Sequence, residues 1–264
     1  IVIHGAGTAG VGIAHLLLDI MVSQGIDRDQ AIRQFWGLSS RGLLIEGGKL
    51  RDFQAPFARP ADEVAGWKLD TLGHYELADV VRNVHPTILI GTSAQPGTFT
   101  EEIVRDMASH TDQPIIMPLS NPTTKAEALP SDVLEWTGGR ALIATGSPFD
   151  PVELNDTRYE IAQANNALIF PGIGLGVISC RASRVSDTMI GAAAQAVASA
   201  VTDRSPGASL LPAMTQLRSI SARVAVAVAE QARREGLAQR HLDNPIQQVY
   251  DAMWQPVYPE VEVI

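Results

Sequence analysis

The chain opens with Ile1-Val2-Ile3-His4-Gly5-Ala6-Gly7-Thr8-Ala9-Gly10. The first four residues predict a buried strand, and the apolar residues after the glycines keep helical spacing as far as Gly25. The glycines between them fit the pattern G-x-G-x-x-G in the strand–turn–helix context that this pattern requires. The stretch therefore predicts a dinucleotide-binding turn, and the alternative is a glycine-rich turn without a ligand.

Each position of this turn has an expected role. Gly5 permits the tight turn, Gly7 lets the backbone approach a pyrophosphate, and Gly10 or Gly12 lets the helix pack close to the strand. The expected contacts to the dinucleotide come from Gly5, Ala6, Gly7, Thr8 and Gly10.

The rest of the first part alternates between strand and helix patterns. Strands are predicted at 35–38, 87–91, 114–119 and 141–144, and helices at 75–84 and 98–110. Thr98 and Glu101 have capping-box spacing, and Ser131 is positioned to cap a further short helix. This alternation predicts an α/β fold, a doubly wound (Rossmann-type) parallel sheet with helices on both faces.

Strand patterns fade after about residue 170. Helices are predicted at 186–201 and 216–235, the second ending at Gly236, and residues 203–212 form a linker rich in Ser, Pro and Gly. We therefore expect a dinucleotide-binding domain at 1–166 and a helical C-terminal segment at 167–264.

Composition excludes several classes of protein. Of the 264 residues, 45% are hydrophobic and 19% are charged, which is typical of a packed globular chain. A net charge of −9 without a Lys/Arg run argues against nucleic acid and anionic membranes as partners. The single cysteine, Cys180, and the lack of a leader pattern favour the cytoplasm. Because the chain begins inside a predicted strand, we expect it to be a fragment.

The choice of dinucleotide stays open at this point. Ser39 and Ser40 stand near the end of the second predicted strand, where an NAD-binding protein of this fold usually has an acid for the ribose hydroxyls. Without that acid a 2′-phosphate is not repelled, and Arg41 is close enough in sequence to pair with one, which favours NADP. Alternatively, Arg41 is a solvated turn residue.

Polar residues follow two of the later strands. Asn121 and Ser147 come after the strands at 114–119 and 141–144, and ligands of doubly wound sheets lie beyond the carboxyl ends of the strands. An amide offers both a donor and an acceptor without charge, which suits binding a carboxylate and a carboxamide. A lone Asn before Pro would otherwise be a turn former.

Taken together, these segments resemble the malic enzymes, most strongly the bacterial members, from residue 1 to at least residue 223. The resemblance rests on five segments in the same order and spacing: Gly5 to Ala14, Trp36 to Leu43, Leu119-Ser120-Asn121-Pro122-Thr123, Gly146-Ser147-Pro148-Phe149, and Asn165-Asn166 to Phe170-Pro171-Gly172.

The resemblance implies oxidative decarboxylation of L-malate to pyruvate and carbon dioxide, with NAD or NADP accepting the hydride and Mn or Mg assisting. In that family the acid is a Tyr, the base is a Lys and three carboxylates bind the metal, and all of them precede the segment that corresponds to Ile1. We therefore assign no catalytic residue and no metal ligand here, interpret Asp150 as a turn residue, and expect this chain alone to be inactive.

The resemblance also assigns binding residues. It implies that Asn121 and Asn165, with Asn166 beside them, contact substrate and nicotinamide. The family usually has Asp where Ser39 stands, whereas Gln54 resembles the NAD-using members, in which NADP users tend to have Lys. These indications conflict, and we give preference to NAD.

Two other functions remain as alternatives: a dinucleotide-binding module without catalysis, and another NAD(P)-dependent dehydrogenase on the same fold. The expected partners are the dinucleotide, malate or pyruvate, a missing N-terminal domain of the same enzyme, and further copies of the chain in a homo-oligomer. Because the C-terminal helices are apolar on several sides, we expect the chain to self-associate or to leave them poorly ordered.

Overall fold

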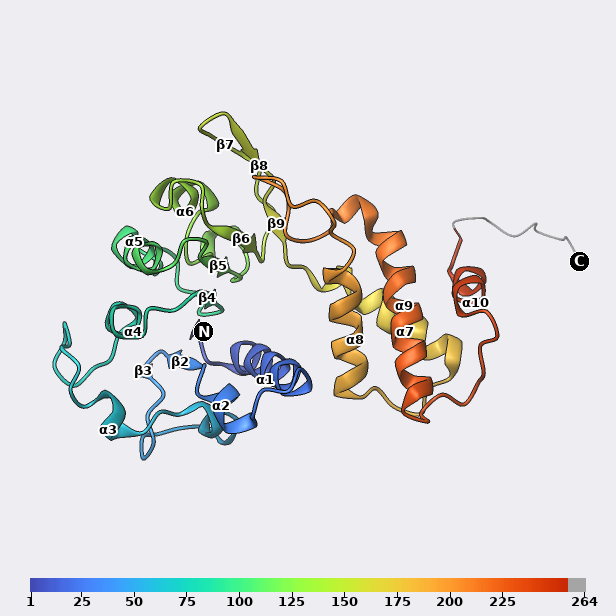
Figure 1. Cartoon of the computed structure of the whole chain (residues 1–264), viewed down its shortest axis with the longest axis horizontal. Helices are drawn as coiled ribbons and strands as arrows, with labels where there is room; N and C mark the ends of the chain where they lie inside the picture. Colours follow the sequence, from blue (N-terminus) through green and yellow to red (C-terminus); the bar gives the residue numbers. More distant parts are fainter. Residues whose placement is uncertain (256–264) are drawn as a thin grey trace, which may run out of the picture. The chain divides into compact units, whose positions relative to one another are not determined.

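The computed structural model describes residues 1–255, which form two compact units (Figure 1). The first unit comprises residues 1–165 and 201–213, and the second comprises residues 166–200 together with the described residues 214–255. The segment 201–213, which the sequence placed with the helical part, thus belongs to the first unit. The two units are described separately.

The first unit is built on a mostly parallel sheet. Its strands lie in the order β3-β2-β1-β4-β5-β6-β9, with β3 (Gly42–Leu43) antiparallel to β2 and the others parallel. The parallel strands are β1 (Val2–His4), β2 (Trp36–Ser39), β4 (Ile88–Gly91), β5 (Ile115–Pro118), β6 (Leu142–Thr145) and β9 (Ala162–Gln163). A separate hairpin joins β7 (Val152–Leu154) to β8 (Thr157–Tyr159). The predicted doubly wound sheet is confirmed.

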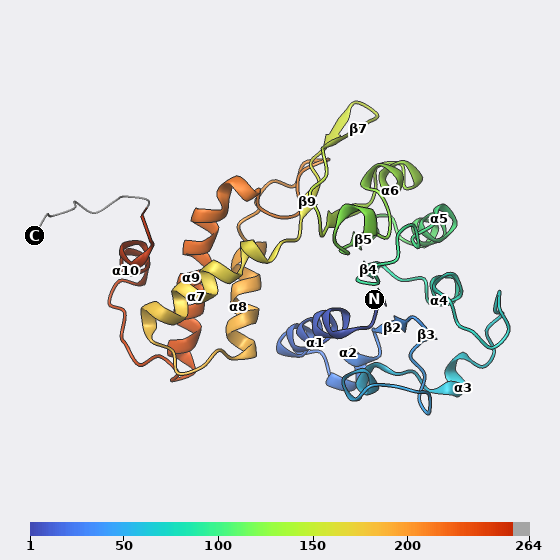
Figure 2. The ribbon, with the colours of Figure 1, turned by 180° about the vertical axis from the view of Figure 1, so that it is seen from behind.

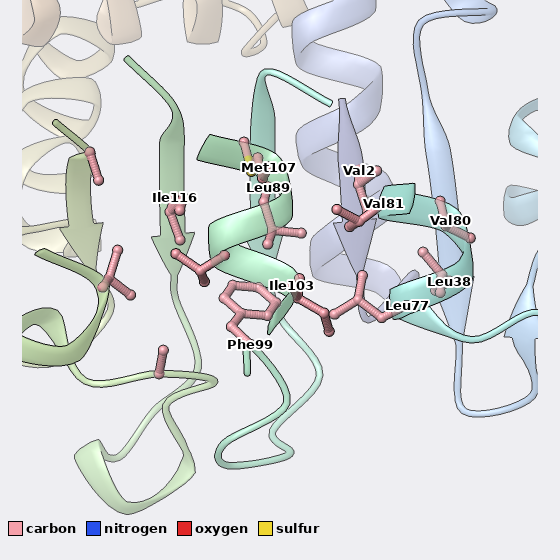
Figure 3. Close-up of a cluster of buried hydrophobic side chains, with 14 of the residues drawn as sticks. Val2, Leu38, Leu77, Val80, Val81, Leu89, Phe99, Ile103, Met107 and Ile116 are labelled. Atoms are coloured by element: carbon pink, nitrogen blue, oxygen red, sulfur yellow. The ribbon is translucent and has the colours of Figure 1, made fainter. Parts of the chain in front are cut away.

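Helices cover both faces of this sheet, because alternate strand residues project to opposite sides. Val2, Leu89 and Ile116 pack against α4 (Leu77–Val84), α5 (Glu101–His110) and α6 (Pro130–Trp136), as Figure 3 shows for the first two helices. Ile3 and Ile90 pack on the other face, in a core shared with α1 (Thr8–Ser23), α2 (Arg28–Ile32) and the 3₁₀ turn Asp52–Phe57. The short helix α3 (Ala61–Val64) and the 3₁₀ turn Thr123–Lys125 lie in connections.

Two helix caps differ from the prediction. The side chain of Thr100, not Thr98, caps α5 by accepting from the Ile103 N–H at 3.4 Å. Thr98 instead donates to Gln95 O within the preceding turn. Helix α6 begins at Pro130, so Ser131 lies inside its first turn and cannot cap it. In each case the backbone turn before the helix decides which hydroxyl lies at the cap.

The second unit is helical. It contains α7 (Phe170–Cys180), α8 (Asp187–Ala198), α9 (Leu217–Arg234) and α10 (Pro245–Ala252), with 3₁₀ turns at Asn166–Leu168 and Met214–Gln216. Helix α9 packs against α7, α8 and α10 (Figure 2). The helices predicted at 186–201 and 216–235 are confirmed as α8 and α9, whereas α7 and α10 were not predicted. None of the helices within residues 1–255 is long and apolar enough to span a membrane.

Close contact between α7 and α9 depends on glycine. A Cβ at Gly172 would lie 2.5 Å from the Cβ of Val224, and a Cβ at Gly176 would lie 2.6 Å from Ala225 O. Both distances are shorter than atoms tolerate, so α7 approaches α9 along its glycine face.

Candidate functional site

The glycine turn after β1 is held between β2 and β4. The N–H groups of Gly5 and Ala6 both donate to Leu38 O, at 2.9 and 2.7 Å, and Thr92 Oγ1 donates to Gly5 O at 2.8 Å. Gly5 has φ +107°, and a Cβ there would lie 2.4 Å from the carbonyl carbon of Thr92. Only glycine fits this turn.

The structure also decides between Gly10 and Gly12. A Cβ at Gly10 would lie 2.4 Å from Gly5 O and 2.9 Å from Cγ2 of Ile3, whereas a Cβ at Gly12 would meet no atom within 4 Å. Gly10 is therefore the residue that lets α1 pack against β1. At Gly7 the nearest atom to an added Cβ is 4.0 Å away, so the turn is open on that side.

Among residues 1–255, the first backbone N–H groups of α1 have no acceptor. The first hydrogen bond of the helix runs from Val11 N–H to Gly7 O at 3.0 Å. The N–H groups of Thr8, Ala9 and Gly10 come before it and therefore have no acceptor within the helix. The N-cap is Gly7, which has no side chain to satisfy them, and the first turn contains no acidic residue. β1 lies between β2 and β4, where the order of the strands reverses, which is where this fold binds anions and nucleotides.

Ser39 lies at the end of β2, as predicted, but its hydroxyl is engaged locally. It accepts from Arg41 N–H at 3.2 Å and donates to Gly42 O at 3.4 Å, within the tight turn between β2 and β3. Ser40 and Arg41 form the exposed tip of this turn.

Gln54 connects to the glycine turn across 48 residues of sequence. Its side chain is buried, donates from Nε2 to Ala6 O at 2.6 Å and accepts from Arg51 N–H at 2.9 Å. The neutral amide of Gln54 thus supports the glycine turn through its bond to Ala6 O, and no positive charge stands at residue 54.

The loops after β4 and β5 are joined by one buried carboxylate, which no sequence pattern indicated. Glu127 accepts from both the N–H and the Oγ of Ser93, at 2.8 Å each, and from the N–H and Oγ of Ser120, at 3.3 and 2.6 Å. The Oγ of Ser120 also accepts from Ala94 N–H at 2.9 Å. These bonds fix the two loops relative to each other at the carboxyl edge.

His4, the last residue of β1, lies beside this carboxylate. Within residues 1–255 neither of its ring nitrogens has a hydrogen-bond partner, although both are buried. Burial lowers the pKa of His4 below its usual value, and the negative charge of Glu127 partly offsets that shift. The lowered pKa favours the neutral imidazole.

Asn121 and Ser147 lie side by side in the loops after β5 and β6. Ser147 Oγ donates to Asn121 Oδ1 at 2.5 Å, and this bond joins the loop after β5 to the loop after β6. The strand β9 runs parallel to β6, so Asn165, which follows it, lies at the same edge of the first unit. Asn166 begins the second unit, and its position relative to this edge is not assigned.

Two hollows of the first unit lie away from this edge. One, of about 380 Å³, is lined by residues such as Arg140, Tyr159 and Gly207, and the other, of about 690 Å³, lies around Arg33 and Arg59. Neither includes the glycine turn or Asn121. Among residues 1–255, no three His, Cys, Asp or Glu side chains gather in an arrangement that could hold a metal ion.

Comparison with known proteins identifies the chain. The family model described as malic enzyme, NAD binding domain, matches residues 1–233. The chain belongs to the malic enzyme family. It is 50% identical over 266 residues to the NAD-dependent malic enzyme 3 of Bacillus subtilis, covering all of this chain and 47% of that protein. It is 46% identical over 258 residues to an NAD-dependent malic enzyme of Pseudomonas aeruginosa, covering 96% of this chain and 46% of that one.

Solved structures agree with this place in the malic enzyme family. The malic enzyme of Entamoeba histolytica aligns with a TM-score of 0.68 at 26% identity, over 95% of this chain and 46% of that one. The malic enzyme of Pyrococcus horikoshii aligns with a TM-score of 0.66 at 23% identity, which shows the same fold. The chain spans about half the length of the curated relatives it matches.

Proposed function

We propose that the first unit binds NAD(H), with the pyrophosphate over the N-terminus of α1. The observation that carries this proposal is the set of N–H groups at Thr8, Ala9 and Gly10, which precede the first intrahelical bond where the strand order reverses. Three donors and the positive end of a 16-residue helix favour a dianionic pyrophosphate.

The preference for NAD is supported by Gln54. This residue places a neutral amide under the turn, bonded to Ala6 O, and offers no positive charge to a 2′-phosphate. Arg41, the cation of the β2–β3 turn, is exposed, as a solvated turn residue would be. The relatives from Bacillus subtilis and Pseudomonas aeruginosa are named NAD-dependent, which also supports NAD.

In the whole enzyme, we propose, this chain supplies the dinucleotide half of a site that oxidises and decarboxylates L-malate to pyruvate. Asn121 and Asn165 would contact the nicotinamide and the substrate at the carboxyl edge, and Asn166 is the next residue in the sequence. The family's Mn or Mg would polarise the C2 oxygen of malate. No described group of residues in this chain fits that metal, so no step through it is assigned here.

Calorimetric titration of NAD⁺ and NADP⁺ into this chain tests the proposal. We expect NAD⁺ to bind, NADP⁺ to bind more weakly, and Gly10→Ala to abolish binding because the added Cβ collides with Gly5 O. The matched control is Gly12→Ala, whose Cβ meets nothing within 4 Å and which should bind NAD⁺ like the parent chain. The absence of heat with either dinucleotide would disprove the proposal.

The same chain is expected to show no malate-dependent reduction of NAD⁺ with Mn²⁺ present. Each positioned acid or base contributes roughly 100- to 10,000-fold to a rate. In the malic enzymes that this chain resembles, the acid and the base both precede the segment that corresponds to Ile1. Turnover by the pure chain would show that the acid and the base lie within it.

A further inference from the structure

The side-chain amide of Asn121 is held at one end only. Within residues 1–255 its one hydrogen-bond partner is Ser147, whose Oγ donates to Oδ1 at 2.5 Å. Ser147 is buried, at 4% exposure, whereas Asn121 is exposed at the carboxyl edge. One end of the amide is thus fixed by the protein and the other is available to a ligand.

The hydroxyl proton of Ser147 decides whether Oδ1 or Nδ2 of Asn121 faces the serine. A serine hydroxyl carries one proton, and in the part of the chain that the structure describes the only acceptor for it is Asn121. The Thr145 hydroxyl bonds the backbone O of Ser147 and does not compete for that proton. If the amide turned over, Nδ2 would face the hydroxyl, and a buried donor would lose its acceptor.

We propose that Ser147 is a positioning residue for ligand binding, which holds Asn121 so that Nδ2–H₂ faces the ligand. Asn121 then recognises an acceptor oxygen and disfavours a donor at that place. Two ligands share this chemistry: the carboxamide oxygen of nicotinamide and a carboxylate oxygen of the substrate. The inference rests on the proposed function, because it needs a dinucleotide at this edge.

The first test observes the amide directly by ¹H–¹⁵N spectroscopy of this chain. The Nδ2–H₂ pair of Asn121 is identified by its loss in Asn121→Asp, and Ser147→Ala should move it in the free chain. NAD⁺ is then added, followed by malate. A shift of the pair with NAD⁺ assigns the carboxamide oxygen, and a shift only after malate assigns the carboxylate.

The spectra separate two kinds of failure. If the backbone signals of the glycine turn do not move with NAD⁺, the proposed function itself fails. If they move but the Nδ2–H₂ pair moves with neither ligand, dinucleotide binding stands and the inference about Ser147 is overturned.

The second test measures affinity for whichever ligand shifts the pair. Ser147→Ala should weaken binding by about 2- to 10-fold, the range of one net hydrogen bond. It should cause no further loss in an Asn121→Ala background, because Ser147 acts through that amide. Ser131→Ala is the matched control, because it removes an exposed hydroxyl that bonds only Asp132 among residues 1–255.

ADP-ribose provides a second control, since it has the pyrophosphate but neither a carboxamide nor a carboxylate. Its affinity should be the same for the parent chain and for Ser147→Ala. Equal losses for ADP-ribose and for the ligand, or equal losses with and without the Asn121 amide, would show a general structural defect and overturn the inference.

Discussion

At the residue scale, the chain keeps a neutral imidazole and a buried carboxylate beneath its binding edge. His4 ends β1, directly before the glycine turn, and Glu127 joins the loops after β4 and β5. The ring nitrogens of His4 and the side chain of Glu127 are buried, and a change of protonation or charge is costly there. Each therefore gives a measurable signature.

The first signature is a dependence of stability on pH. Burial lowers the pKa of His4 in the folded chain below the unfolded value of 6.5, so the unfolded state binds more protons between the two values. The free energy of unfolding is therefore highest, as far as His4 is concerned, above pH 6.5. It falls as the pH drops from the unfolded pKa of 6.5 toward the lower pKa of the folded state. Urea unfolding at a series of pH values should show this decline, and His4→Gln should flatten it.

The control for His4 is His241→Gln, which replaces an exposed ring of the second unit. A decline that persists in His4→Gln, or that disappears in His241→Gln, would contradict the assignment to His4.

The second signature is the cost of changing Glu127. Glu127→Gln keeps the shape but removes the negative charge from the oxygen that accepts three of the bonds, and its NH2 group then faces the N–H donor of Ser120. Bonds to a charged group contribute about 1.5–3 kcal/mol each, so we expect the free energy of unfolding to fall by roughly 2–4 kcal/mol. Glu135→Gln, on the exposed side of α6, should change it by less than about 0.5 kcal/mol.

These residues also mark what the sequence could predict. The glycine turn and the meeting of Asn121 with Ser147 follow from local patterns and from one rule, that parallel strands end at the same edge. Glu127 gives no such signal, because it follows a 3₁₀ turn and bonds Ser93 across 34 residues. The choice of Gly10 over Gly12 likewise needed the distance between α1 and β1.

At the scale of elements, α7 and α9 form a close pair that a matched set of glycines can test. Gly176→Ala puts a Cβ 2.6 Å from Ala225 O and should lower the free energy of unfolding by about 1–3 kcal/mol through overpacking. Gly174→Ala on the same helix meets nothing within 4 Å and should raise it by about 0.5–1 kcal/mol. Thermal unfolding followed by circular dichroism measures both, and equal effects would argue against the close approach.

The sequence predicted the elements that are stabilised by their own residues and missed those that depend on pairing or packing with distant residues. The strands β1, β4 and β5 are short apolar runs between turn residues, and the sequence shows them plainly. β3 and β9 have two residues each and exist through pairing with β2 and β6, which no local pattern records. Helix α7 was missed because Gly172, Gly174 and Gly176 are poor helix formers, and packing against α9 overrides that propensity.

At the scale of the whole molecule, the exposed apolar surface lies elsewhere than the sequence indicated. Val224, Ala225 and Val228 of α9 are buried inside the second unit. Phe170 and Ile178 of α7 are among the exposed large apolar side chains, at 68% and 73% exposure, and their spacing of eight residues places them on the same broad side of that helix.

We therefore expect the chain to self-associate through α7. Light scattering should show particles larger than the monomer, and Phe170→Ser combined with Ile178→Ser should shift them toward the monomer mass. Leu72→Ser, at a lone leucine of the first unit that is 99% exposed, is the control and should leave the mass unchanged. A monomeric parent chain would contradict this expectation.

Residues 201–213 belong to the first unit although the second unit begins before them in the sequence. The first unit therefore cannot finish folding until this later segment has been synthesised. Glu160 N–H donates to Gly207 O at 2.8 Å, so this bond must wait until the later segment has been translated. Residues 166–200 separate the two parts of the first unit, and at roughly 5–20 residues per second the ribosome needs about 2–7 seconds to supply them. During that interval α7 and α8 emerge while the first unit is incomplete, and its uncovered side is what a chaperone or a protease would meet.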